Sequence, residues 1–287
     1  MPLCDVYYQP RAQKALQRAL RGERMAHAYI FHGPEGVGKE SLARGLGQLL
    51  LCGNPSQREL PAEMSRMIGV SEMRDACGAC EDCRWVASGA HPDFHLIERR
   101  LHREHPDPEV RRRKGLELGV DVIRHFVVNR VGYTPVRGRA KVFVICEADE
   151  MSTAAQNALL KTLEEPPTTT FLVLLTGSPD QLLSTTRSRC QSVEFQGLPA
   201  SFLEQRLQAL HGDWPAEQRA WYVRGAAGRL GAMLADVEDG RFALHQRISR
   251  MLDGLKESNF DDVLKEWTEE SKRLGEVESE RVSTSRR

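Results

Sequence analysis

The sequence predicts an α/β protein in which a parallel sheet flanked by helices is followed by a smaller, entirely helical region. Short apolar stretches alternate with segments of helical periodicity, as expected when helices connect parallel strands. A glycine-rich loop, Gly33–Ser41, joins the first apolar stretch to a helix. After Leu198 the pattern is helical only. Ligands of such folds bind at the carboxyl ends of the strands, where this loop would lie.

The first elements surround the glycine-rich loop. Apolar residues recur at helical intervals over 9–20, and the pattern ends near Gly22. Residues 29–31 are expected to form a buried strand, and 41–51 a helix after the loop. Alternating apolar and polar residues over 93–98 predict the next strand.

Charged residues dominate 99–114, where seven basic side chains stand against three acidic ones. Pro106 and Pro108 are expected to break any helix in this segment. A solvated surface loop is one interpretation, because charge runs are usually solvated. A contact with a nucleic-acid phosphate backbone is the alternative.

The remaining elements are expected in this order: a helix over 121–131, a strand over 141–146, a helix over 154–163, a strand over 171–175, helices over 200–211, 215–224 and 228–237, one or two helices over 242–274, and a polar tail over 276–287. The continuous apolar strands are typical of a sheet buried on both faces. Ser152 or Thr153 can cap the helix that follows, with Gln156 placed for the reciprocal bond from Thr153.

Composition limits the classes of partner. The 287 residues include 40 basic and 40 acidic side chains, so the formal net charge is +0. Binding to nucleic acid would therefore depend on a local patch and not on the net field. The sequence has no apolar stretch of about 18 residues and no signal-peptide profile at its N-terminus. A cytoplasmic protein with no membrane partner is expected.

Four of the seven cysteines, Cys52, Cys77, Cys80 and Cys83, suggest a metal site. The tandem C-x-x-C pattern of the last three is typical of metal binding in a cytosolic chain. Four thiolates complete a tetrahedral Zn²⁺ site with no open position, so zinc would be structural. The alternative is that the three clustered cysteines are inert surface residues. A polar stretch, 53–75, that looks like an insertion separates Cys52 from the others.

The loop G-P-E-G-V-G-K-E-S resembles a phosphate-binding loop, with an ordinary strand-to-helix turn as the alternative. Its glycines would let backbone amides approach phosphates, and Lys39 would reach the β and γ oxygens. Glu40 stands where a hydroxyl would bind Mg²⁺, and Ser41 lies one residue late. A carboxylate beside a triphosphate adds negative charge. ATP is the expected nucleotide, and Mg²⁺ binding is expected to be poor.

Five ordered stretches resemble bacterial DNA polymerase III clamp-loader subunits, which belong to the AAA+ family. They are H-A-Y-I-F-H-G-P-E-G-V-G-K (27–39), C-G-A-C-E-D-C (77–83), H-P-D-F-H-L-I-E (91–98), N-A-L-L-K-T-L-E-E-P-P (157–167) and S-R-C (188–190). The resemblance runs from about residue 5 to 235 and includes both gamma/tau and delta-prime types.

The resemblance implies a role for each matching residue. Nucleotide contacts would come from Gly33, Gly36, Gly38, Lys39, Glu40, Ser41 and the γ-phosphate sensor Thr176. Glu147 keeps the place of the residue that polarises water, whereas Cys146 replaces the aspartate that orients Mg²⁺. Ala232 replaces the basic residue of the second sensor. Arg189 would be an arginine finger that acts in a neighbouring subunit's site.

Loss of metal contacts at Glu40 and Cys146, with Arg189 retained, is the pattern expected of the delta-prime type. Such a subunit would hydrolyse ATP poorly and assemble with gamma/tau and delta types to load a sliding clamp on primed DNA. The alternatives are an active gamma/tau-type ATPase and a zinc-stabilised adaptor outside replication.

The resemblance also implies three regions. Residues 1–197 would form the AAA+ domain with a zinc module at 52–83, residues 198–240 a helical lid, and residues 241–287 a short C-terminal helical region. Only about 45 residues follow Gly240, which is short for the helical collar of the family.

Overall fold

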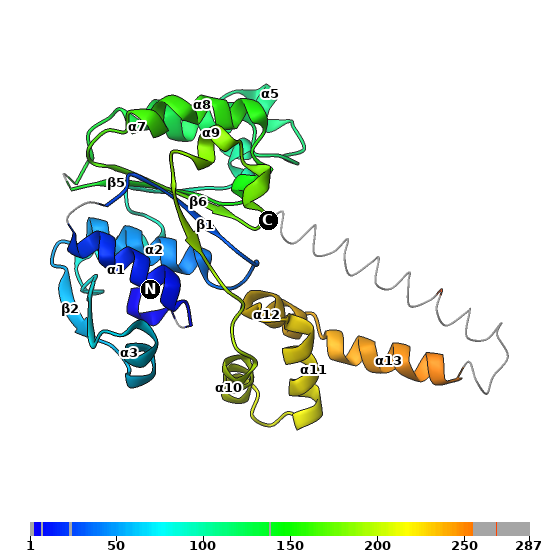
Figure 1. The fold of residues 1–287 in the computed structure, drawn as a ribbon. Helices are drawn as coiled ribbons and strands as arrows, with labels where there is room; N and C mark the ends of the chain where they lie inside the picture. The colour runs from blue at the N-terminus through cyan, green and yellow to red at the C-terminus, as the bar shows by residue number, and fades with distance from the viewer. Residues whose placement is uncertain (1–2, 7, 23–24, 138, 255–267, 269–287) are drawn as a thin grey trace.

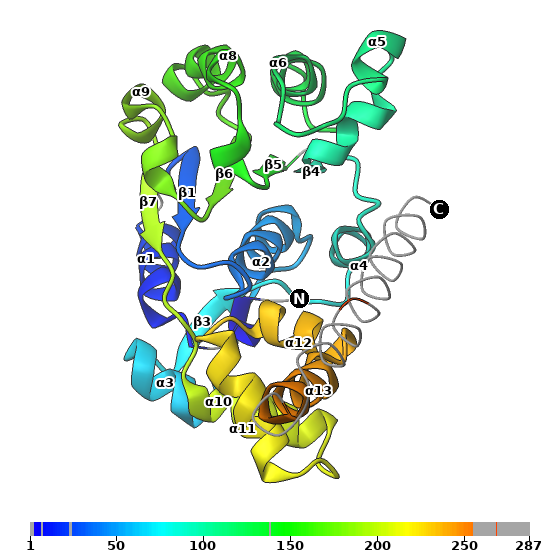
Figure 2. The same ribbon diagram turned by 90° about the vertical axis from the view of Figure 1, so that its right-hand side faces the viewer.

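The computed structural model describes residues 3–6, 8–22, 25–137, 139–254 and 268. Its centre is a five-stranded sheet in the order β4-β5-β6-β1-β7, and every neighbouring pair is parallel. The strands are β1 (Ala28–His32), β4 (Phe94–Ile97), β5 (Lys141–Ile145), β6 (Thr170–Thr176) and β7 (Gln191–Glu194). Figure 2 shows helices above and below this sheet. The predicted α/β fold class is confirmed.

Alternation along β1 divides the core between the two faces of the sheet. Tyr29 and Phe31 point into one apolar cluster, which also holds Leu16 of α1 (Pro10–Arg21) and Leu46 of α2 (Lys39–Leu51). Ile30 points into a second cluster beneath α6 (Val120–Ile123) and α8 (Thr153–Glu164). Because period-2 alternation sends neighbouring side chains to opposite faces, the strand must be apolar throughout.

The other α-helices and strands of this part of the chain are short. They are β2 (Ser56–Glu59), α3 (Ala62–Ile68), β3 (Glu72–Asp75), α4 (Glu81–Ser88), α5 (Pro108–Arg111), α7 (Asn129–Val131) and α9 (Ser184–Arg187). A π-helical segment, Arg124–Val128, connects α6 to α7, so the expected helix over 121–131 is present but locally widened. Strands β2 and β3 form an antiparallel hairpin.

A helical region completes the described structure (Figure 1). It contains α10 (Ala200–Leu210), α11 (Ala216–Ala226), α12 (Leu230–Glu238) and α13 (Arg241–Gly254), which share an apolar cluster separate from the two at the sheet. The helices predicted over 242–274 and the tail over 276–287 lie mainly outside the described residues. Division of the chain into domains at 197 and 240 stays a prediction.

One local expectation about capping was confirmed, and two other local expectations were wrong. Ser152 caps α8 by accepting a hydrogen bond from the Ala155 amide. The reciprocal bond from the Thr153 amide is not formed, since the Gln156 side-chain oxygen accepts instead from the Leu183 amide at 2.8 Å. The segment 99–114 also contains helix, because Pro108 occupies the first turn of α5, where a missing amide hydrogen costs nothing.

The sequence analysis did not predict the elements that have little apolar content. The polar stretch 53–75 folds as the β2–β3 hairpin with α3, and β7 has only Val193 buried. Within the ranges that the structure describes, no helix is both long and apolar enough to cross a membrane.

Gly47 tests the packing of α2 on the sheet. A Cβ at this position would lie 2.4 Å from Cε2 of the buried Phe94 ring. Gly47→Ala should therefore lower the free energy of unfolding by about 1–3 kcal/mol, the usual cost of overpacking. Gly225→Ala is the matched control, because nothing lies within 4 Å of its added Cβ in α11. There we expect a gain of up to about 1 kcal/mol from helix propensity. Urea unfolding of both variants measures the change in the free energy of unfolding. Equal changes in the two variants would contradict the close packing of Gly47 against Phe94.

His95 should make stability depend on pH. Its ring stacks on Phe143, with centroids 4.7 Å apart. Burial, reinforced by nearby Arg130 and Lys141, lowers the pKa of His95 from 6.5 to about 4. The unfolded chain takes up the proton first, so stability is complete above pH 6.5 and declines as pH falls toward 4. Denaturant titrations between pH 6.5 and 4 should show that the free energy of unfolding falls less for His95→Gln than for the wild type. The exposed His245→Gln should follow the wild type.

Candidate functional site

The loop between β1 and α2 requires glycine at three positions. Gly33, Gly36 and Gly38 have φ angles of 141°, 70° and 100°, which side chains of L-residues avoid. A Cβ on Gly33 would also lie 2.3 Å from the backbone oxygen of Phe195. Amides of such a loop at a helix N-terminus form an anion-binding cradle. The strand-loop-helix setting predicted for the loop is therefore present.

A cavity of about 660 Å³ opens beside this loop, within the usual range for a small-molecule site. It is bounded by the loop, the carboxyl ends of β5 and β6, and helices α10 and α12. The predicted nucleotide-site residues in its lining are Gly36, Gly38, Lys39, Glu40, Ser41, Glu147 and Thr176. Gly33 lies at the base of the loop, and Arg189 lies outside this lining.

Lys39 is directed toward its own loop. Its ammonium group donates to the carbonyl oxygens of Gly33, at 2.5 Å, and Pro34, at 2.8 Å. Burial lowers the pKa of Lys39, and the nearby carboxylates of Glu35 and Asp149 partly oppose that shift. The Lys39 ammonium group is thus held against the backbone of its own loop.

Glu40 and Cys146, which replace the groups that the resemblance assigns to Mg²⁺ binding, do not suit the metal. The Glu40 carboxylate pairs with Arg44 of the next helical turn at 2.7 Å. Burial, reinforced by neighbouring carboxylates, raises the pKa of the Cys146 thiol to about 12, so the sulfur stays protonated at neutral pH. Mg²⁺ prefers oxygen ligands in octahedral geometry. These side chains therefore do not fit the metal.

Glu147 is bound by an arginine that the sequence did not assign to the site. Arg99 donates from Nε to Oε2 at 2.8 Å and from Nη2 to Oε1 at 2.6 Å. The same guanidinium donates to the Leu116 carbonyl at 3.0 Å. Glu147 lies in the left-handed region, with φ of 50°, two residues after the end of β5. A bidentate pair of this kind holds the carboxylate away from other partners.

Thr176 and Asp149 shape the end of β6. The Thr176 hydroxyl accepts from the Ser178 amide at 2.9 Å. Asp149 accepts from the amides of Gly177 and Ser178 at 2.9 and 3.1 Å. The predicted sensor is therefore fixed at the cavity by the turn that follows it.

The helical region meets the loop backbone directly. The Gly231 amide donates to the Gly36 carbonyl at 3.0 Å, and a Cβ on Gly36 would lie 2.9 Å from that amide nitrogen. Ala232, which the resemblance aligns with the second sensor, follows Gly231 and has no polar side chain. The cation that this region places in the cavity lining is Arg206 of α10, which the sequence analysis missed.

Arg189 lies between α9 and β7. Its guanidinium donates to the Glu164 carboxylate at 2.5 Å and to the Thr185 carbonyl at 2.8 Å. About a third of the side chain is exposed. The arginine is thus held at the surface by a carboxylate from the end of α8.

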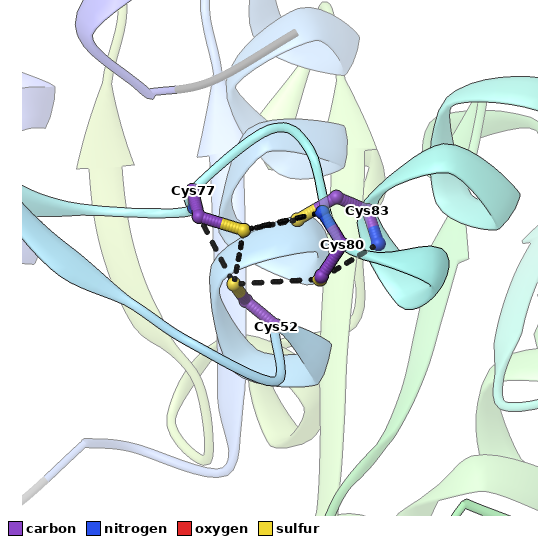
Figure 3. A group of neighbouring side chains, drawn as sticks. All are labelled: Cys52, Cys77, Cys80 and Cys83. Atoms are coloured by element: carbon purple, nitrogen blue, oxygen red, sulfur yellow. Dashed lines mark hydrogen bonds between the residues drawn. The ribbon is translucent and has the colours of Figure 1, made fainter.

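The four predicted metal ligands converge (Figure 3). Their sulfur atoms lie within 4.8 Å of one another, and Cys52 lies 3.5 Å from Cys77 and 3.9 Å from Cys80. Tetrahedral zinc with Zn–S bonds of about 2.3 Å separates its sulfurs by about 3.8 Å. Hydrogen bonds from the amides of Ala79 and Cys80 lower the pKa of Cys77 to about 6, which favours the thiolate. The cysteine cluster fits structural zinc.

Metal content tests this cluster. We expect about one zinc per purified chain, because four thiolates leave no open position, and loss of that zinc in Cys80→Ser. Cys190→Ser, outside the cluster, is the control and should keep the metal. Metal analysis by mass spectrometry measures both. A wild-type chain without zinc would refute the assignment.

A family model and several curated relatives identify the family of this chain. A family model described as "DNA polymerase III, delta subunit" matches residues 8–199. DNA polymerase III subunit delta' of Bacillus subtilis is 34% identical over 199 residues, or 69% of this chain and 51% of the relative. The delta' subunit of Pseudomonas aeruginosa is 33% identical over 250 residues, or 78% and 67%.

A more distant similarity extends to another subunit type. The tau subunit of Bacillus subtilis is 30% identical over 206 residues, which cover 72% of this chain and 31% of that protein. The chain spans about half the length of the Bacillus subtilis delta' subunit that it matches. On the family match and these identities, the chain belongs to the delta-prime family of bacterial DNA polymerase III clamp-loader subunits.

Proposed function

We propose that this chain is a clamp-loader subunit that hydrolyses ATP poorly in its own cavity and donates Arg189 to a neighbouring subunit's nucleotide. The complex would then place a sliding clamp on primed DNA. The observation that carries the proposal is the contrast between two sites. The groups that would bind Mg²⁺ are replaced or paired, whereas Arg189 lies at the surface.

Poor hydrolysis follows from the charges around the cavity. Phosphoryl transfer depends on Mg²⁺ and on positioned cations that neutralise the developing charge. Glu40 is paired with Arg44, and Cys146 is a buried neutral thiol. Glu147 would have to break two hydrogen bonds to Arg99 before it could polarise a water molecule.

To contact a nucleotide in another subunit, Arg189 would have to leave its ion pair with Glu164. Its partner Glu164 is half-exposed, and surface ion pairs of this kind contribute about 0–1 kcal/mol. A neighbouring triphosphate, with several negative charges, would compete well for the guanidinium. Arginine fingers contribute about 10³–10⁵ in rate in other NTPases.

The remaining assignments complete the proposal. Gamma/tau and delta types would be the neighbouring subunits, zinc would stabilise the cysteine cluster, and the protein would act in the cytoplasm. Segment 99–114 stays a candidate DNA contact, although Arg111 and Arg113 already bind partners within the chain. An adaptor outside replication is set aside by the family membership.

The alternative is an active gamma/tau-type ATPase. Two observations favour it: the similarity to the Bacillus subtilis tau subunit, and retention of Lys39 and Glu147 at the cavity. It requires a shifted metal and release of Glu147 from Arg99.

ATP turnover separates these functions. For the purified chain alone, we expect turnover near background that Lys39→Ala does not change. In a reconstituted loader with a gamma/tau-type partner, Arg189→Ala should reduce the partner's kcat by about 10³-fold or more. Arg11→Ala, which removes another surface ion pair, should leave it unchanged.

Two outcomes would contradict the proposal. Robust Mg²⁺-dependent turnover by the chain alone, abolished by Lys39→Ala, would favour the gamma/tau-type ATPase. Full turnover in the loader with Arg189→Ala would exclude the finger role.

A further inference from the structure

We propose that Glu164 is a latch for Arg189. The Glu164 carboxylate holds the guanidinium against the end of α8, and a nucleoside triphosphate bound in the neighbouring subunit replaces that carboxylate as the acceptor. This inference rests on the proposed function, because it concerns the control of the arginine finger. Glu164 then acts as a positioning residue, since it affects the neighbour's nucleotide only through Arg189.

The contact between the two side chains is short and charged. Arg189 Nη2 lies 2.5 Å from Glu164 Oε1, and Nη1 donates to the Thr185 carbonyl at 2.8 Å. The two contacts use different nitrogens, so they fix the orientation of the guanidinium as well as its position. An arginine has five N–H donors, and no contact within the described part of the chain uses Nε of Arg189. The guanidinium therefore keeps donors for a ligand from outside the chain.

Glu164 occupies an unfavourable position for an acidic residue. It is the last residue of α8, and Pro166 and Pro167 follow it closely. The C-terminal end of a helix carries a partial negative charge, which repels a carboxylate and attracts a cation. Arg189 offsets that repulsion. The carboxylate and the helix end together therefore hold the arginine in the absence of a nucleotide.

The backbone beneath Arg189 is fixed by burial. The Arg189 amide donates to the Thr186 carbonyl at 3.3 Å, and Thr186 is fully buried. The next residue, Cys190, packs against the apolar cluster beneath α8. Opening of the latch therefore requires rotation of one side chain and no movement of the segment that carries it.

Charge decides which acceptor Arg189 binds. About a third of the Arg189 side chain and about half of the Glu164 side chain are exposed, so water weakens their ion pair. One carboxylate carries a single negative charge, whereas a triphosphate carries several and offers more oxygen acceptors. The ion pair therefore holds the finger in the isolated chain and yields to the nucleotide of a neighbour.

ATP turnover by a reconstituted loader with a gamma/tau-type partner tests the latch. Glu164→Gln removes the negative charge but keeps the shape of the side chain. We expect the partner's kcat/KM to rise about three- to fivefold, equal to about 0.7–1 kcal/mol, because the finger no longer has to leave a carboxylate. Glu164→Asp keeps the charge on a shorter side chain and should lie between Glu164→Gln and the wild type.

Asp180→Asn is the matched control, because it removes the carboxylate that pairs with Arg187 at 2.7 Å in the neighbouring helix α9. It should leave the partner's kcat/KM unchanged. Glu164→Gln combined with Arg189→Ala should be as slow as Arg189→Ala alone, since the latch acts only through the arginine. The unfolding temperature of Glu164→Gln should stay close to that of the wild type, because the lost ion pair and the relieved charge at the helix end are similar in size.

Two results would overturn the latch and leave the proposed function standing. The first is a kcat/KM for Glu164→Gln at or below the wild-type value in a loader that Arg189→Ala slows. The second is a gain that persists when Arg189→Ala is added to Glu164→Gln. Wild-type turnover in Arg189→Ala alone would instead exclude the finger role, and the latch with it.

Discussion

The close approach of backbone to backbone at the glycine-rich loop is the constraint on which the rest of the site depends. Gly33 meets the Phe195 carbonyl at the end of β7, and Gly36 meets Gly231 at the start of α12. The first contact fixes the loop on the sheet, and the second fixes the helical region on the loop. A side chain at either glycine would separate these parts, so the cavity exists only because the loop lacks Cβ atoms there.

Charge pairing within the chain takes the place that metal coordination has in active P-loop enzymes. Glu40 with Arg44, and Glu147 with Arg99, are each satisfied by the protein itself. The pairs cost little, because the side chains remain partly exposed and keep some hydration. They nevertheless change the chemistry of the cavity, since a paired carboxylate is a poor metal ligand and a poor base.

The sequence predicted those features whose signal is local. The strand before the loop, the glycines and Lys39 lie within twelve residues, and tandem C-x-x-C spacing identifies three of the four clustered cysteines. The β2–β3 hairpin was missed because its strands are polar and mostly exposed. Buried Asp75 in β3 is polar for a tertiary reason: its carboxylate accepts hydrogen bonds from the amides of Leu3 and Cys4, some 70 residues away.

The two site residues that the sequence analysis missed, Arg99 and Arg206, also depend on contacts between segments that are distant in the sequence. Arg99 and Glu147 are 48 residues apart, and only the pairing of β4 with β5 brings them together. In the sequence, the polar face of α10 resembles any solvated helix surface. Arg206 borders the cavity because the helical region contacts the loop at Gly36. The sequence showed that the second-sensor position lacks a basic side chain, but it could not show that another helix presents one.

The separation of the two sites explains how one can change while the other is kept. Arg189 follows α9, where Thr186 is fully buried and Leu182 and Cys190 pack into the cluster beneath α8. None of these contacts involves Glu40 or Cys146, which lie at the loop and at the end of β5. Changes at Glu40 or Cys146 would therefore leave the contacts that support Arg189 intact. The two parts of the proposed function, poor hydrolysis in the cavity and a role for Arg189 in a neighbouring subunit, therefore rest on separate sets of contacts.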